Sequence, residues 1–463
     1  MKKYNKVILV AVDTLSKDHL GCYGYKTPEE NTSPFIDSLA EKNLKFENFY
    51  ASDVPTPSSF TSFLTGTRGI HNGIVGFNNS IEEFSVDTPT LAERYFEEGF
   101  RTGMMSNLIY PCPWLKSGFQ DIYPPGMSFQ GGTAEEVTEE SSNWLDNHAQ
   151  EDFFLFTHYW DPHCPYRERS KEEYRKMFSR EEYENYAPDM KYFKENEYLD
   201  LLYKEKHEEN NDPYEPAENL RNYDSNIRYV DGCLENLFIK LKDLGIRDET
   251  LVLITSDHGE AFGEYGFWDH YSSYRNISNI PLIIVGDKIN SKNVETYAQS
   301  VDLMPTLLEL CGLDSPQGLD GKSMTPLLEG EDEFRGSVIV NSDATVIQRM
   351  YVKNDHALVH TPSRPVWDHI DEYELFDLSE DSRQIRNIAD KEEEKAQKLR
   401  LELQDWLSKE LDGSPDPLQL SIFRGGWMWN GFSRILEPSK WKNLLKEYPK
   451  LKNTLKSNLI YQK

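Results

Sequence analysis

An acid and an imidazole stand side by side at Asp257 and His258, after the apolar run 251–254 and two intervening hydroxyl residues. Such a run is typical of a buried strand, and ligands in open α/β sheets bind in the crevice outside the carboxyl ends of strands. A second apolar run, 7–12, ends in Asp13. Two strand ends would thus bring two carboxylates and an imidazole to one point, which predicts a divalent metal site. For either acid alone, the alternative is a cap of the next helix.

Hydroxyl side chains are concentrated between these two half-sites, in the stretch 55–66. A hydroxyl held at a helix N-terminus beside a divalent cation has a lowered pKa, and the amides of the first turn can accept an anion. Thr56 is therefore the candidate nucleophile. The alternative is a capping residue for a helix that runs through Phe63.

A third apolar run, 153–156, is followed by two histidines and an aspartate, among them Asp161 and His163. His163 could protonate a leaving group or bind a substrate oxygen, and Asp161 could orient it, or both could hold a second metal ion. The glycine-containing loop 263–270 can fold back over the same edge and bring His270 within reach of a bound anion.

Composition restricts the partners of this chain of 463 residues. It has 50 Lys and Arg against 79 Asp and Glu, a formal charge of −29, which repels nucleic acid and anionic membranes. The five cysteines are scattered and form no CxxC pair, so neither a disulfide framework nor a zinc–thiolate cluster is expected. The N-terminus runs straight into the first strand, and no apolar stretch approaches the roughly 20 residues that span a bilayer. We expect a cytoplasmic protein with a small anionic ester as substrate; the sequence is silent on oligomeric state.

Alternating strand-like and helix-like segments predict an α/β fold, with a mostly parallel central sheet flanked by helices. This catalytic domain should cover residues 1–335, with a charged helical insertion at 166–222. A smaller C-terminal α+β subdomain, an antiparallel sheet followed by a helix, should cover 336–412, and an aromatic tail at 413–463 should pack on the domain. Helices are expected at 33–42, 90–98, 226–244 and 303–311.

The order of segments resembles the sulfatase branch of the alkaline phosphatase superfamily from residue 6 to about 410. The matching segments are 13–15 with 18–24, 64–66, 90–93 with 99–102, 161–163, 256–260, 301–306, 319–323, and 374–378 with 387–389. The resemblance implies an alkaline-phosphatase-like fold and a divalent metal ion (Ca, Mg, Mn or Zn). Whether one or two ions bind is left open by the spacing.

The resemblance also implies roles for single residues. Asp13, Asp257 and His258 match metal ligands, and Thr14 stands where many members place a second acidic ligand. Asp161 is a further candidate ligand. Four side chains are expected to contact the substrate or its leaving group: His163, Asn78 (with Asn79 as the register alternative), Asn107 and Arg68. His270 and Asn107 occupy positions where sulfatases usually carry lysines.

The nucleophile position departs from the family pattern. Sulfatases of this branch need Cys or Ser in a C/S-x-P-x-R motif, where it is oxidised to formylglycine, whereas this chain has Thr56, with Ser58 and Phe60 at the Pro and Arg positions. A threonine cannot become that aldehyde, and superfamily relatives that cleave phosphoryl groups use an unmodified Thr or Ser on the metal. The leading hypothesis is therefore hydrolysis of a phosphate ester, diester or phosphonate by metal-bound Thr56, with His163 or His270 protonating the leaving oxygen. The alternatives are a true sulfatase without formylglycine and a non-catalytic anion-binding protein.

Overall fold

A computed structural model describes most of the chain. The described residues are 4–77, 79, 81–126, 131–164, 166, 169–185, 190–195, 200, 204, 215–344, 346–364, 367 and 369–423.

The core is an eight-stranded sheet in the order β12-β2-β11-β8-β1-β7-β5-β6. Its strands are β1 (Lys6–Val12), β2 (Leu44–Phe46), β5 (Arg101–Met105), β6 (Asp121–Tyr123), β7 (Phe153–Tyr159), β8 (Thr250–Thr255), β11 (Leu282–Val285) and β12 (Lys292–Val294). Only β11 among them runs antiparallel to its neighbours. Strand β7 is buried along its whole length, as is β8, because helices cover both faces of the sheet. The expected α/β fold with a mostly parallel sheet is confirmed.

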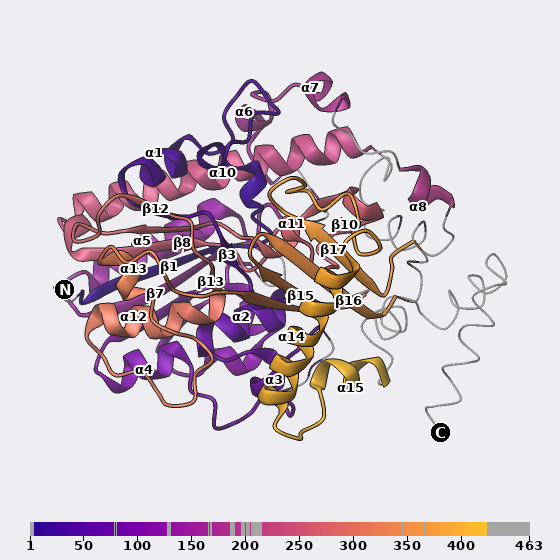
Figure 1. Ribbon diagram of the computed structural model, residues 1–463. Helices are drawn as coiled ribbons and strands as arrows, with labels where there is room; N and C mark the ends of the chain where they lie inside the picture. Colours follow the sequence, from indigo (N-terminus) through magenta and orange to yellow (C-terminus); the bar gives the residue numbers. More distant parts are fainter. Residues whose placement is uncertain are drawn as a thin grey trace, which may run out of the picture.

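Helices pack on the two faces of the sheet in two groups (Figure 1). One group is α1 (Pro34–Lys42), α5 (Ala134–His148) and α10 (Pro216–Asp243); the other is α2 (Thr56–Thr65), α4 (Leu91–Glu97) and α12 (Leu303–Cys311). Three of the four expected helices match α1, α4 and α12 closely. The fourth, α10, begins at Pro216, earlier than expected, since a proline at the first helical position starts the helix inside the polar segment.

The insertion at 166–222 contributes short helices among its described residues. These are α6 (Glu172–Arg175), α7 (Arg180–Glu184) and α8 (Lys191–Glu195). Helices α6 and α7 pack against α10, on the side away from the sheet (Figure 1). Further short elements are α3 (Gly69–Asn72), α11 (Arg275–Ser278), α13 (Thr325–Leu328), β3 (Phe49–Tyr50), β9 (Ala261–Phe262), β10 (Trp268–Asp269) and β13 (Ala298–Gln299). In the described part of the chain, no helix has both the length and the apolarity needed to cross a membrane.

A second sheet of five strands, in the order β17-β16-β15-β14-β4, forms the C-terminal subdomain. Its strands are β14 (Val338–Asp343), β15 (Ile347–Lys353), β16 (His356–Ser363), β17 (Tyr373–Asp377) and β4 (Asp53–Val54). Helix α14 (Glu393–Leu411) packs on this sheet and α15 (Pro417–Phe423) follows it. The expected antiparallel strands and charged helix are present. The tryptophans of the aromatic tail, at 427, 429 and 441, lie outside the described residues.

Strand β4 joins the two parts of the molecule. It comes from the catalytic domain, two residues before Thr56, yet it pairs in parallel with β14. A chain of buried polar contacts extends this link: Arg349 holds Asp416 and Asn341, and Asn341 Nδ2 donates to Asp53 Oδ1 at 2.9 Å. Asp53 in turn accepts from Ser62 in α2 through its Oδ2 atom. The C-terminal subdomain thus helps to position the helix that carries the candidate nucleophile.

Replacing Arg349 with Met should cost about 3–5 kcal/mol of unfolding free energy, because the buried Asp416 carboxylate loses its cation and Asn341 loses a partner. Urea unfolding of wild type and variant measures this loss. Lys353→Met is the matched control. Lys353 lies on the same strand as Arg349 and pairs with Glu402 of α14, but its side chain is about a third exposed, so its loss should cost less than about 1 kcal/mol. Equal losses in the two variants would show that the buried link does not hold the subdomain.

Candidate active site

Strand register brings the predicted metal ligands together. Strands β1 and β8 are parallel neighbours, with Ala11 opposite Thr255, so Asp13 and Asp257 both follow two residues later at the same sheet edge. Ligand atoms of Asp13, Asp257 and His258 lie within 4.8 Å of one another, and all three residues are buried.

The electrostatics of this group fit a divalent cation. Burial raises the pKa of Asp13 well above its usual range, and the nearby charge of Asp257 raises it further; burial likewise raises the pKa of Asp257. Asp13 Oδ1, Asp257 Oδ2 and the Thr14 hydroxyl are buried without a hydrogen-bond partner. Two like charges and three unsatisfied oxygens in a dry interior are costly unless a cation sits among them. These side chains would hold a divalent ion.

The imidazole of His258 is held in one orientation. Its Nδ1 lies 3.0 Å from Gly259 O, and a carbonyl oxygen only accepts, so Nδ1 carries the proton and Nε2 carries the lone pair. Nε2 lies 3.0 Å from Thr56 Oγ1 and 3.2 Å from Asp257 Oδ2. The Thr56 hydroxyl therefore donates to His258, and the same lone pair faces the carboxylates, as a metal ligand requires.

Thr56 is the first residue of α2, and every residue of this ten-residue helix is buried. Ser59 Oγ, one turn along, donates to the backbone oxygen of Asp257 at 2.6 Å, which ties the helix N-terminus to the end of β8. The N–H groups of a first helical turn attract anions. The predicted hydroxyl thus stands between an anion-binding helix end and the candidate metal ligands.

Thr14 sits in a strained backbone conformation beside the ligands. Its φ of 56° is in the left-handed region, which a β-branched residue rarely adopts and which costs on the order of 1–3 kcal/mol. The conformation aims Thr14 N at Asp257 Oδ1, 3.1 Å away, while Tyr223 of α10 donates to Thr14 O. Thr14 thus orients Asp257 through its backbone, and its hydroxyl is the neutral group at the expected fourth-ligand position.

His158, near the end of β7, lies behind Asp13 and is fully buried. Its Nε2 is 3.3 Å from Asp13 Oδ2 and its Nδ1 is 3.0 Å from Ser106 Oγ. Burial lowers the pKa of His158 well below its usual range, so the ring is neutral, and a hydrogen bond from Nε2 orients Asp13. The sequence shows this histidine next to the site, but only the strand register reveals its partner.

His163 and His270 continue from His258 as a row of rings. His270 stacks on His258 with ring centroids 4.4 Å apart, and His163 lies 5.0 Å from His270 by the same measure. Both histidines expected near the leaving group are therefore close to Thr56 and its partner. Asp161 has a different partner: its Oδ1 accepts from Ala134 N at the start of α5, and it belongs to no group of three metal-binding side chains in the described residues.

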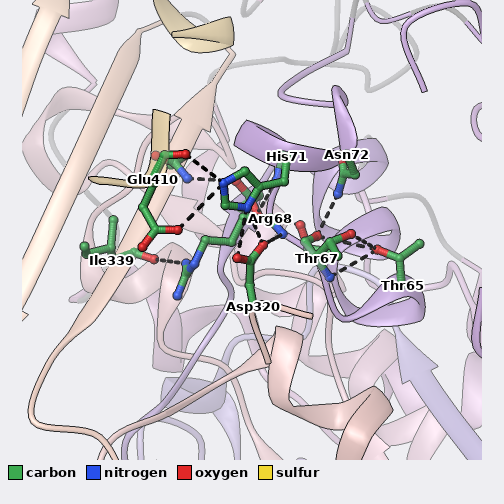
Figure 2. A network of polar contacts seen from close by, with 12 residues as sticks. Thr65, Thr67, Arg68, His71, Asn72, Asp320, Ile339 and Glu410 are labelled. Carbon is green, nitrogen blue, oxygen red and sulfur yellow. Dashed lines mark hydrogen bonds and ion pairs between the residues drawn. The ribbon is translucent and has the colours of Figure 1, made fainter. Parts of the chain in front are cut away.

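The expected substrate contacts are engaged elsewhere in the protein. Arg68 donates to Ile339 O and Gln299 Oε1 and lies in the polar network drawn in Figure 2, with its backbone N–H bound to Asp320. Asn107 Nδ2 donates to the carbonyl oxygens of Pro125 and Gly131. These bonds hold loops together, which differs from the expected contact with substrate.

Two further expectations concern the segment after α3. Asn78 lies outside the described residues. Asn79, the register alternative, accepts from the backbone N–H groups of Val75 and Gly76 through Oδ1 and closes its own loop.

Arg169 is a site residue that sequence reasoning missed. Its positive charge counteracts the rise in the pKa of Asp13, and also that of Asp161, whose pKa burial raises to about 6. It stands at the start of the charged insertion, where one more cation among many charges carries no recognisable signal. Tertiary structure alone brings this cation near the predicted carboxylates.

Asp257→Asn should be at least as stable as wild type without a divalent ion and less stable than wild type with one. Without metal, the variant should be at least as stable as wild type, because it removes repulsion between two buried carboxylates. With Mn²⁺ or Ca²⁺ at 100 times the dissociation constant, wild type should gain about 2.7 kcal/mol and the variant should gain little. Thermal unfolding with and without the ion tests this.

The control for that experiment is Asp332→Asn, which removes an exposed carboxylate bound to Lys292 and should leave the ion-induced stabilisation unchanged. An ion effect of the same size in wild type and in Asp257→Asn would place the cation elsewhere.

Comparison with known proteins identifies the family of the chain. A family model described as Sulfatase matches residues 5–313, and one described as N-sulphoglucosamine sulphohydrolase, C-terminal, matches residues 263–412. N-acetylglucosamine-6-O-sulfatase of Bacteroides thetaiotaomicron is 24% identical, over 91% of this chain and 90% of its own length. Mouse iduronate 2-sulfatase (Mus musculus) is 25% identical over 67% of this chain and 69% of its own.

Among solved structures, the phosphonate monoester hydrolase of Agrobacterium radiobacter superposes with a TM-score of 0.71 at 18% identity, over 88% of this chain and 95% of that one. This likeness concerns the fold. The first family model covers more than half of the sequence, from before β1 to beyond α12. The chain therefore belongs to the sulfatase family, in the alkaline phosphatase-like superfamily, and is a hydrolase of ester bonds.

Proposed function

We propose that this enzyme hydrolyses a phosphate ester, a phosphate diester or a phosphonate, with an unmodified Thr56 as nucleophile. The observation that carries the proposal is the 3.0 Å contact between Thr56 Oγ1 and His258 Nε2, beside the two buried carboxylates. A threonine at this position has no route to formylglycine, so its own hydroxyl must act if the position is catalytic. A divalent ion (Ca, Mg, Mn or Zn) bound there would lower the pKa of the hydroxyl and neutralise negative charge.

The protein groups around Thr56 suit an anionic ester. The first turn of α2 offers N–H groups to the transferring group, and the buried hydroxyl is shielded from water that would compete with it. His258 accepts the hydroxyl hydrogen and so holds Oγ1 among the candidate metal ligands. An ion bound through Nε2 would take that lone pair, and the ion itself would then lower the pKa of the hydroxyl. Water would later release the product from Thr56.

The positive charge near this site comes from a residue outside the family motif. Phe60, at the position where the family motif has arginine, is buried and packs edge-on against His158, with ring centroids 4.6 Å apart, so it offers no charge. Arg169, from the insertion, is the cation whose charge acts on Asp13 and Asp161. We therefore assign Arg169 to binding of the substrate anion.

The ring of His270 stacks on that of His258, and the ring of His163 lies next to His270. The leaving oxygen needs either a proton or a cation as its bond breaks. These two side chains are the groups that would provide it.

Sulfate ester hydrolysis is the second candidate, because the two relatives named above, among others, are named for sulfatase activities. In that case Thr56 would attack sulfur directly, without formylglycine. A non-catalytic anion-binding role is disfavoured, since the Thr56 hydroxyl contacts the oriented imidazole of His258, whose ligand atom lies within 4.8 Å of those of Asp13 and Asp257.

Thr56→Ala should lower phosphoryl turnover by on the order of 10³-fold or more, because the attacking oxygen is lost, whereas Thr56→Ser should retain measurable turnover. The assay compares aryl sulfate, phosphate monoester, phosphate diester and phosphonate substrates with Mg, Mn, Ca or Zn added. Ser58→Ala is the matched control: Ser58 lies in the same helix turn, but its hydroxyl donates to Pro55 O.

Turnover that survives Thr56→Ala would point to attack by water and overturn the threonine nucleophile. Turnover of aryl sulfate alone, lost in Thr56→Ala, would keep the nucleophile and replace the phosphoryl substrate with a sulfate ester.

A further inference from the structure

A second group of metal-binding side chains lies next to the first. Ligand atoms of His163, Cys164 and His270 lie within 4.8 Å of one another, and all three residues are buried. His163 and Cys164 come from the turn after β7, while His270 follows β10, so two segments about a hundred residues apart converge here. Cys164 also lies within 4.8 Å of carboxylate oxygens of Glu260 and Asp269, which are buried as well.

Both imidazoles of this group are oriented as metal ligands are. Nδ1 of His163 donates to Cys164 O, and Nδ1 of His270 lies 3.2 Å from Glu260 Oε1. In metal sites, a ligating histidine generally donates its other ring nitrogen to a carbonyl or carboxylate, which fixes the tautomer and directs the remaining nitrogen at the ion. The same nitrogen is used in both rings, so Nε2 is the atom that would bind an ion in each.

We infer that His163, Cys164 and His270 form a second metal site, selective for a thiophilic ion of the zinc class. Two imidazole nitrogens and a thiolate match the donors that zinc prefers and that calcium and magnesium avoid. Three protein ligands leave the fourth tetrahedral position for a substrate oxygen or water. Glu260 is the positioning residue that orients His270. This inference is the same for a phosphate ester and a sulfate ester, so it does not depend on the phosphoryl proposal.

Charge favours a cation at this place. The carboxylates of Glu260 and Asp269 are buried beside the thiol, and a cation held here would be attracted by their negative charge. The resemblance places lysines of ordinary sulfatases where this chain has Asn107 and His270, and Asn107 is bound to backbone carbonyls. A zinc ion held by His270 restores at this edge the positive charge that those positions lack.

The second site adjoins the first, because the His270 ring stacks on His258 at 4.4 Å between centroids. An imidazole that binds zinc through Nε2 does not also donate a proton from that atom. With an ion in place, the cation would therefore stabilise the leaving oxygen, and His163 and His270 would bind the cation.

Metal content and cobalt spectroscopy test the inference without an activity assay. Purified enzyme, dialysed against zinc and then against metal-free buffer, should retain one equivalent of zinc more than Cys164→Ser does. Cobalt-loaded wild type should show thiolate-to-cobalt charge-transfer absorption in the near ultraviolet, absent in Cys164→Ser. Cys311→Ser is the control and should keep the absorption. Cys311 is a buried cysteine at the end of α12, and its thiol contacts the Tyr95 hydroxyl.

A second variant guards against misfolding of Cys164→Ser. Glu260→Gln should weaken zinc at this site by about 10–100-fold and keep the cobalt–thiolate absorption at saturating cobalt, because it removes only the carboxylate that orients His270. Wild type that retains no more zinc than Cys164→Ser, or cobalt-loaded wild type without the thiolate absorption, would overturn the second site. Asp257→Asn and Thr56→Ala should both keep the absorption, so failure of the nucleophile proposal would be seen separately.

Discussion

The structure depends on one electrostatic constraint: two carboxylates, Asp13 and Asp257, are buried side by side at the ends of neighbouring parallel strands. Burial and mutual repulsion raise the pKa of Asp13, and oxygens of both groups lack a hydrogen-bond partner. A folded protein tolerates such an arrangement when a cation belongs there. The strained backbone at Thr14 and the neutral imidazole of His158 both hold these carboxylates in place, so several costs are incurred at one site, as is common where chemistry occurs.

The same constraint explains how the two sheets cooperate. Thr56 must stand at the cation site with its helix N-terminus facing the sheet edge, and α2 is held from both sides. Ser59 ties it to the end of β8, while Asp53 in β4 ties it to the C-terminal sheet through Asn341 and Arg349. The C-terminal subdomain therefore contributes to the active site although none of the candidate catalytic side chains comes from it.

The row formed by His258, His270 and His163 extends the site away from Asp257 and ends at Cys164. Oxygen donors dominate at one end of the row, and nitrogen and sulfur donors at the other. This change of donor type along a few ångströms is what separates the two inferred metal preferences. Arg169 adds a fixed charge from the insertion, so the site collects its positive charge from sources other than the lysines and arginine of the family pattern.

Sequence alone determined the fold class and the meeting of four side chains, those of Asp13, Asp257, His258 and Thr56, at one edge of the sheet, because apolar runs that end in polar residues mark the carboxyl ends of buried strands. Motif order also indicated the family. Side chains whose role depends on a partner far along the chain were decided only by the tertiary structure. Asp161 accepts a hydrogen bond from the start of α5, Arg68 and Asn107 bind backbone carbonyls, and Cys164 meets His270. Spacing along the chain reports which residues reach an edge of the sheet, whereas the direction of each side chain follows from packing between segments that are distant in sequence.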